Sequence, residues 1–131
     1  MILNRLASIA ASAMTAAETR LGVAADNIVN SASAGTEDTA FRPRRAIPQA
    51  VPGGGVRVDI RPVDPPFQRI ATPDSPAADA EGLLSVPNVS LVRESANILE
   101  AEAAFKAGAA LLARSDELSG RLLDILDSDS E

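Results

Sequence analysis

The first thirty residues, MILNRLASIAASAMTAAETRLGVAADNIVN (residues 1–30), decide the fold of this chain. When they are taken at alternating steps of four and three, eight successive positions are apolar, and half of these are alanine. Such a heptad pattern is typical of a helix that pairs with another helix. The alanines allow the backbone of that partner to approach closely. The eight positions are Leu3, Ala7, Ala10, Met14, Ala17, Leu21, Ala24 and Ile28.

The apolar stripe of this first arm is wider than a two-stranded seam, because Ile2, Leu6, Ile9, Ala16 and Val23 flank it. A helix that is apolar on two sides requires more than one neighbour. The Ser-, Gly- and Asp-rich segment 30–39 then ends the helix. Asn27 and Asn30 are expected to cap or terminate it, since Asn tolerates left-handed backbone and bonds exposed backbone groups.

The prolines separate this arm from a second one. All nine lie between Pro43 and Pro87, and proline is strongly disfavoured inside helices. The second arm therefore begins after Pro87, with Asn88 or Ser90 as its N-cap, and runs to about Asp127. One apolar or small-residue seam of this arm comprises Ile98, Ala101, Phe105, Gly108, Leu112, Ser115, Ser119, Leu122 and Leu126, and a second comprises Ala104, Leu111, Leu118 and Ile125.

The centre, from Phe41 to Val86, is expected to be extended or loop. Residues 55–60 alternate apolar and charged side chains, as a half-buried strand does, whereas the prolines that follow argue against a continued central strand. Residues 52–55, PGGG, form a turn without the lysine and hydroxyl residue of a phosphate-binding loop. The carboxylates of Asp74, Asp79 and Glu81 are interpreted as solvated loop groups rather than acid–base partners.

The composition argues against most kinds of catalytic, metal-binding and nucleic-acid-binding site. The chain has no His, Cys, Trp or Tyr, so zinc, haem and iron–sulfur sites and Cys or Ser–His nucleophiles are not expected. A net charge of −6 argues against nucleic acid as a partner. The short basic cluster of Arg42, Arg44 and Arg45 is interpreted as a solvated or subunit-contacting loop rather than a phosphate-binding patch. We expect no small-molecule substrate, no cofactor and no enzymatic activity.

The amino terminus shares some features with a signal peptide. Arg5 and the residues Ala11-Ser12-Ala13 imitate its charged region and cleavage site, but the apolar stretch between them is too short. We expect the segment to be retained, with a signal peptide as the alternative. No segment approaches the length of a membrane span.

The two arms resemble a known family. Residues 13–30, AMTAAETRLGVAADNIVN, resemble the amino-terminal signature of bacterial flagellar rod and hook proteins. Residues 87–94, PNVSLVRE, continuing through Asn97, Ala101, Phe105 and Ala107, are similar to the carboxy-terminal signature. Phe41-Arg42 and residues 73–82, PDSPAADAEG, bring the resemblance closest to the proximal rod protein next to the rod base. The resemblance covers nearly the whole chain.

This resemblance implies a mainly α fold, in which two long terminal helices pack antiparallel as a coiled-coil-like pair around a Pro/Gly-rich extended or small β centre. The division expected is a helical arm at 1–30, a centre at 31–87, a helical arm at 88–127 and an acidic tail at 128–131. The chain would be exported without a cleaved signal, would polymerise through its terminal helices, and would transmit torque across the periplasm. Its implied partners are other copies, other rod proteins and the rod-base adaptor.

The residues expected to carry subunit packing are Leu3, Ala10, Met14, Ala17, Leu21, Ala24, Ile28, Ile98, Phe105, Leu112, Leu118 and Leu122. Asn27, Asn30, Pro87 and Asn88 are expected at helix termini. The chain departs from the family pattern at Ala103, Phe105, Lys106 and Gly108, where the family usually has Arg, Tyr, Gln and Asn.

Four alternatives stay open at this point. The chain could be a different short rod paralogue, or a divergent paralogue in a second flagellar system. It could instead be a small exported helical adaptor or effector that binds one partner through a helix groove. The stripes could also form an ordinary two-helix core, although each covers more of its helix than one partner can bury.

Overall fold

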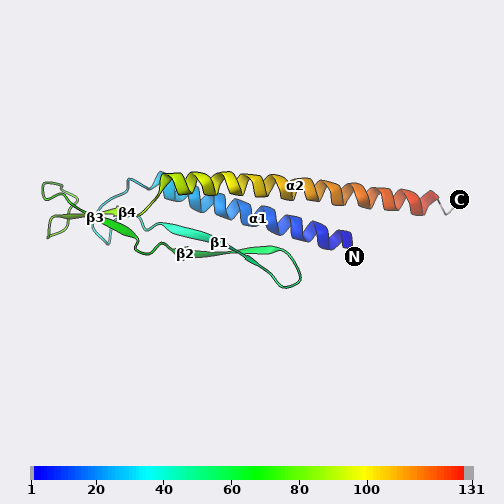
Figure 1. Cartoon of the computed structure of the whole chain (residues 1–131), viewed down its shortest axis with the longest axis horizontal. Helices are drawn as coiled ribbons and strands as arrows, with labels where there is room; N and C mark the ends of the chain where they lie inside the picture. Colours follow the sequence, from blue (N-terminus) through cyan, green and yellow to red (C-terminus); the bar gives the residue numbers. More distant parts are fainter. Residues whose placement is uncertain (1, 129–131) are drawn as a thin grey trace.

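Two long helices lie side by side and run in opposite directions, so that both ends of the chain lie toward the same end of an elongated molecule (Figure 1). The computed structural model describes residues 2–128. It confirms a mainly helical fold with a small β centre. The elements in chain order are α1 (Ile2–Val29), β1 (Arg44–Ala50), β2 (Val56–Pro62), β3 (Phe67–Ala71), β4 (Leu83–Pro87) and α2 (Leu91–Ser128).

The centre forms two separate antiparallel sheets of two strands each. β1 pairs with β2 from Arg44↔Pro62 to Ala50↔Val56, and β3 pairs with β4 from Phe67↔Pro87. Of these strands, the sequence pattern indicated only the one near 55–60, and the expectation of loop or extended chain for the rest of 41–86 was too coarse. Prolines are tolerated here because each strand of a two-stranded sheet has an edge free of ladder hydrogen bonds.

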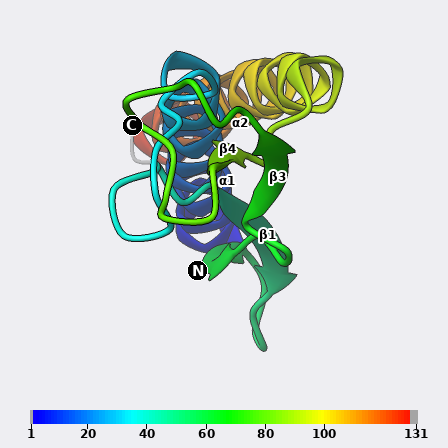
Figure 2. The same cartoon turned by 90° about the vertical axis from the view of Figure 1, so that its left-hand side faces the viewer.

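The β1–β2 hairpin lies against α1 through its glycine turn. Gly53, Gly54 and Gly55 all have positive φ, and a Cβ on Gly54 would lie 2.8 Å from Cδ1 of Ile9. Arg5 Nη2 donates to the Gly53 carbonyl at 2.8 Å, although the two residues are 48 positions apart in the sequence. As a result α1 lies between α2 on one side and the hairpin on the other (Figures 1 and 2).

Asn27 does not terminate α1, which corrects the sequence-based expectation. Its side chain is buried, donates from Nδ2 to the Arg44 carbonyl at 2.7 Å and accepts from the Arg44 amide at 3.1 Å. It therefore joins the helix to the edge of β1. The helix end is held instead by Asn30, whose amide and Nδ2 both donate to the Asp26 carbonyl.

Asn88 does not cap α2 either. Ser90 does, because its hydroxyl accepts from the Arg93 amide at 3.3 Å and its carbonyl accepts from the Glu94 amide. Asn88 instead donates from Nδ2 to the Pro65 carbonyl and from its amide to the Pro66 carbonyl. Pro87 is the buried last residue of β4. The acidic tail expected at 128–131 lies outside the described residues except for Ser128, which ends α2.

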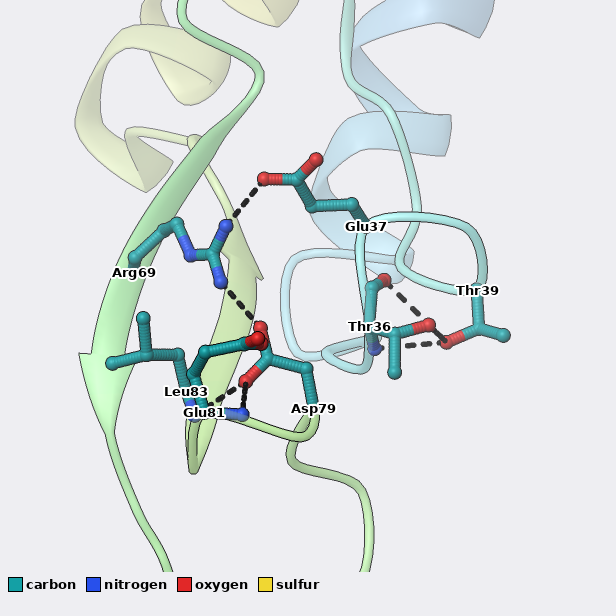
Figure 3. A network of polar contacts seen from close by, with 7 residues as sticks. All are labelled: Thr36, Glu37, Thr39, Arg69, Asp79, Glu81 and Leu83. Carbon is teal, nitrogen blue, oxygen red and sulfur yellow. Dashed lines mark hydrogen bonds and ion pairs between the residues drawn. The ribbon is translucent and has the colours of Figure 1, made fainter.

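An ion-pair network ties the loop after α1 to the second sheet (Figure 3). Arg69 on β3 pairs with Glu37 at 2.6 Å and with Asp79. The Asp79 carboxylate also accepts from the amides of Glu81 and Leu83. The interpretation of Asp79 as a solvated carboxylate was therefore wrong: it organises the turn that leads into β4.

Candidate functional site

The contact between α1 and α2 is made by small residues. Gly108 faces Ala10 and Met14 so closely that a Cβ on Gly108 would lie 2.7 Å from Cγ of Met14 and 3.2 Å from the Ala10 carbonyl oxygen. Ala10, Ala17, Ala24 and Ala101 are buried in the same contact. The helices therefore approach nearly backbone to backbone, as the alanine seam of the first arm predicts.

Two polar contacts fix the register of the helix pair. The buried Ser115 hydroxyl on α2 donates to the Leu3 carbonyl on α1 at 3.1 Å. Nearer the other end of the pair, Arg20 and Glu100 form an ion pair at 2.9 Å. Because Ser115 is opposite the beginning of α1, the part of α2 beyond it extends past α1.

The residues expected to carry packing fall into three groups. Ala10, Ala17 and Ala24 are buried, whereas Leu21, Leu118 and Leu122 are 41%, 47% and 51% exposed. The remainder are half-buried: Leu3, Met14, Ile28, Ile98, Phe105 and Leu112. The large side chains of the predicted seams are thus not covered by the chain itself.

An apolar groove follows one side of the helix pair. Its floor is formed by Ala17, Leu21, Ala101 and Phe105, with Glu18 and Glu102 also lining it, and its volume is about 270 Å³. Lys106 donates a hydrogen bond to Glu102 at 2.7 Å, and this bond together with the lysine charge lowers the pKa of the Glu102 carboxyl. The groove thus has the Glu102–Lys106 pair on its rim.

The largest group of exposed apolar side chains lies on the end of α2 that projects beyond α1, residues 116–128, which we call the α2 overhang (Figure 1). It is about 20 Å long. Its large apolar residues are all exposed: Leu118, Leu122, Leu123, Ile125 and Leu126. Leu122 and Leu126 continue the seam that contains Ser115, and Leu118 belongs to the adjacent seam, but no described residue of α1 lies opposite these three leucines.

Sequence reasoning missed a second exposed apolar group, at the other end of the helix pair. Val29 at the end of α1 and Leu91 and Val92 at the beginning of α2 are all exposed, Val92 to 83%. The signal was available, since Leu91 and Val92 follow the Ser90 cap directly, a position where no preceding helical turn can cover apolar side chains.

The chain buries few large side chains and exposes a large surface area. Its buried aliphatic residues between 2 and 128 are six alanines and Val23. It exposes 8657 Å², whereas a compact monomer of 13.5 kDa exposes about 6,500 Å². Surface of this extent, apolar at both ends, is the mark of a subunit that is covered by neighbours.

Within residues 2–128, no group of three or more acidic, His or Cys side chains could hold a metal ion. None of the described helices is both long and apolar enough to cross a membrane. The arrangement of residues is suited to packing between subunits.

Comparison with known proteins also indicates a protein that packs against other subunits. No family model matches the chain. A flagellar basal-body rod protein FlgC of Escherichia coli O6:H1 is 36% identical over 119 residues, which cover 86% of this chain and 89% of that protein. The FlgC of Salmonella typhimurium is 34% identical over the same shares. That of Agrobacterium fabrum is 29% identical over 135 residues, with 95% of each chain covered.

An elongated helix pair that leaves its apolar ends uncovered, together with these relatives, defines a structural subunit of the flagellar basal-body rod. This confirms the resemblance given by the two arms, and the chain is not an enzyme. More specifically, the chain belongs to the family of the flagellar basal-body rod protein FlgC, a proximal rod protein. The alternative of a small helical adaptor is not favoured.

Proposed function

We propose that this rod subunit polymerises through its terminal helices, with the α2 overhang as its principal contact to neighbouring subunits. The observation that carries the proposal is the row Leu118, Leu122 and Leu126, which lies at steps of four on one face of α2, past the beginning of α1, and remains exposed. Burial of a leucine side chain contributes about 1.5–3 kcal/mol, so covering this row in every copy would favour assembly strongly.

The same proposal extends to the other expected packing residues and to the partners. Leu21 and Phe105 line the open groove and would receive an apolar side chain from a neighbour. Other copies, other rod proteins and the rod-base adaptor are the partners, and the two helices act as a coiled-coil-like arm pair on either side of the centre at 31–87. In this scheme the subunit is exported without a cleaved signal, and the rod transmits torque across the periplasm.

Leu122→Glu tests the role of the overhang. In an assembled rod it would bury an unpaired carboxylate, at a cost of several kcal/mol per copy, whereas in the free subunit position 122 is exposed. We expect rod incorporation and swimming to be lost while the helix content and unfolding midpoint of the purified chain stay unchanged. Ala110→Glu is the matched control, because it adds the same charge at an exposed position of α2 before the overhang. Normal swimming of the Leu122→Glu strain would contradict the proposal.

A further inference from the structure

One face of the β1–β2 hairpin carries an excess of positive charge. Residues that pair directly across an antiparallel ladder share a face, and the pairs Arg45↔Arg61 and Gln49↔Arg57 therefore place three arginines together. All three are exposed. The acidic residue on this face is Asp59, which pairs with Arg61 at 2.7 Å.

The arrangement of these arginines is unfavourable for the isolated subunit. Like charges directly opposite on a sheet are destabilising, and Arg45 and Arg61 are directly opposite. Arg57 reaches only the neutral Gln49, at 3.0 Å. Among the described residues, no side chain forms an ion pair or hydrogen bond with the Arg45 guanidinium, whereas the neighbouring Arg44 pairs with Asp26. The arginines of this hairpin face can therefore still form ion pairs with an acidic partner.

The α2 overhang has the opposite charge. It contains four acidic residues and one arginine. Asp116, Gly120 and Asp124 follow one another at steps of four and so lie on one helix face. Within residues 2–128, neither Asp116 nor Asp124 has an ion-pair partner. Gly120 between them faces open space, so that a partner could approach the helix backbone there.

The two rows also match in length. Arg57 and Arg61 are four strand residues apart, about 13 Å. Asp116 and Asp124 are eight helix residues apart, about 12 Å. An extended arginine row and a helical aspartate row of equal length can therefore pair at both ends at once.

The pairing cannot occur within one chain. The hairpin lies on the side of α1 that faces away from α2 (Figures 1 and 2). Val56, which pairs with Ala50 where the strands meet the turn, bonds to Ser12, and Ser115 bonds to Leu3. This end of the strand pair and Gly120 are therefore separated by about 21 Å along the helix axis.

We propose that the arginine face of the β1–β2 hairpin binds the acidic row of the α2 overhang of a second copy. The inference rests on the proposed function and names the partner of the overhang. Both surfaces belong to the same chain and do not overlap. In the proposed array each copy binds one neighbour through its arginine face and another through its acidic row, a heterologous contact whose repetition generates a helical array rather than a closed dimer. The apolar row of the overhang, on another face of the helix, stays available for other rod neighbours.

Disulfide trapping tests the contact, because the chain contains no cysteine. Gln49→Cys places a thiol on the arginine face and Gly120→Cys places one in the acidic row. A disulfide requires Cα atoms within about 7 Å, and the separation within one chain excludes an internal bond. Oxidation of basal bodies that contain the double variant should give cross-linked dimers and higher multimers. The control is Ala50→Cys with Gly120→Cys, because position 50 lies on the opposite face of the hairpin; it should give about tenfold less.

Charge reversal in the same background gives a second test. Arg57→Glu with Arg61→Glu should reduce the cross-linked product about tenfold, as the loss of two exposed ion pairs would. Adding Asp116→Arg and Asp124→Arg to the same chain should restore it. Failure of this rescue would overturn the proposal, and so would cross-links that mass spectrometry assigns to another rod protein.

Incorporation into the rod separates this inference from the proposed function. If the cysteine variant is found in basal bodies and the strain swims, but no cross-link forms, the hairpin contact is wrong and the rod function stands. If the chain is absent from basal bodies, both are overturned.

Discussion

At the scale of single residues, the close approach of α1 and α2 depends on positions that have little or no side chain. Gly108 is the clearest case, since its space is occupied by Met14 and by the Ala10 backbone. Gly22, also helical, has nothing within reach of a Cβ. These two glycines differ only in their surroundings, so the same substitution at both isolates the packing contribution.

We expect Gly108→Ala and Gly22→Ala to have opposite effects. Alanine in place of a helical glycine stabilises by about 1 kcal/mol, and at Gly22 this is the whole effect. At Gly108 overpacking costs typically 1–3 kcal/mol, which exceeds the gain. The measurement is the free energy of unfolding in urea. Equal stabilisation by both substitutions would show that the helices do not approach as closely as described.

Asn27 is a second residue whose role is specific. Asn27→Asp keeps the acceptor for the Arg44 amide but removes the donor for the Arg44 carbonyl. We expect a loss of about 1–3 kcal/mol in the free energy of unfolding, because a buried polar group is left unsatisfied. Asn30→Asp, at the exposed end of α1, is the matched control and should cost less than 1 kcal/mol. A reversed order of the two losses would argue against the tie between α1 and β1.

At the scale of elements, the helices were predictable and most of the strands were not. A heptad row without proline leaves few alternatives to a long helix, so both arms follow from sequence. β1, β3 and β4 contain or adjoin prolines that sequence reasoning treats as strand breakers, although a free sheet edge accepts them. The roles of Asn27 and Asp79 depend on partners that only the folded chain brings close, and no local pattern signals them.

The position of the hairpin against α1 gives a prediction for this scale. Gly53 and Gly54 both have positive φ, so alanine at either strains the turn by about 1 kcal/mol. Only at Gly54 would the new Cβ also displace Ile9. Gly54→Ala should therefore shift the NMR signals of Ile9 and Ser12 and weaken amide protection in β2, whereas Gly53→Ala should leave these signals in place. Identical spectra for the two variants would mean that the turn does not contact α1.

At the scale of the whole molecule, stability and function are linked through exposed surface. A subunit whose buried aliphatic residues are nearly all alanine gains little from its own core, and its helices depend on packing for much of their stability. The neighbours in the rod supply the remaining contacts. The α2 overhang should be the part that depends on them most.

In the free subunit we expect hydrogen exchange to divide α2 at Ser115. Amides before it are in the helix pair and should be protected, whereas those in the overhang should exchange with little protection, since an isolated helix of this length is marginal in water. The measurement is amide exchange of the purified chain followed by NMR. Uniform slow exchange along α2 would indicate that the overhang is stabilised without neighbours.

The most direct test of assembly through the terminal helices is the location of this chain in a cryo-EM reconstruction of purified basal bodies. The account predicts that the α1–α2 pair lies in the wall of the proximal rod, with Leu118, Leu122 and Leu126 covered by adjacent subunits. A rod in which the α2 overhang projects into solvent, with those three leucines uncovered, would contradict it.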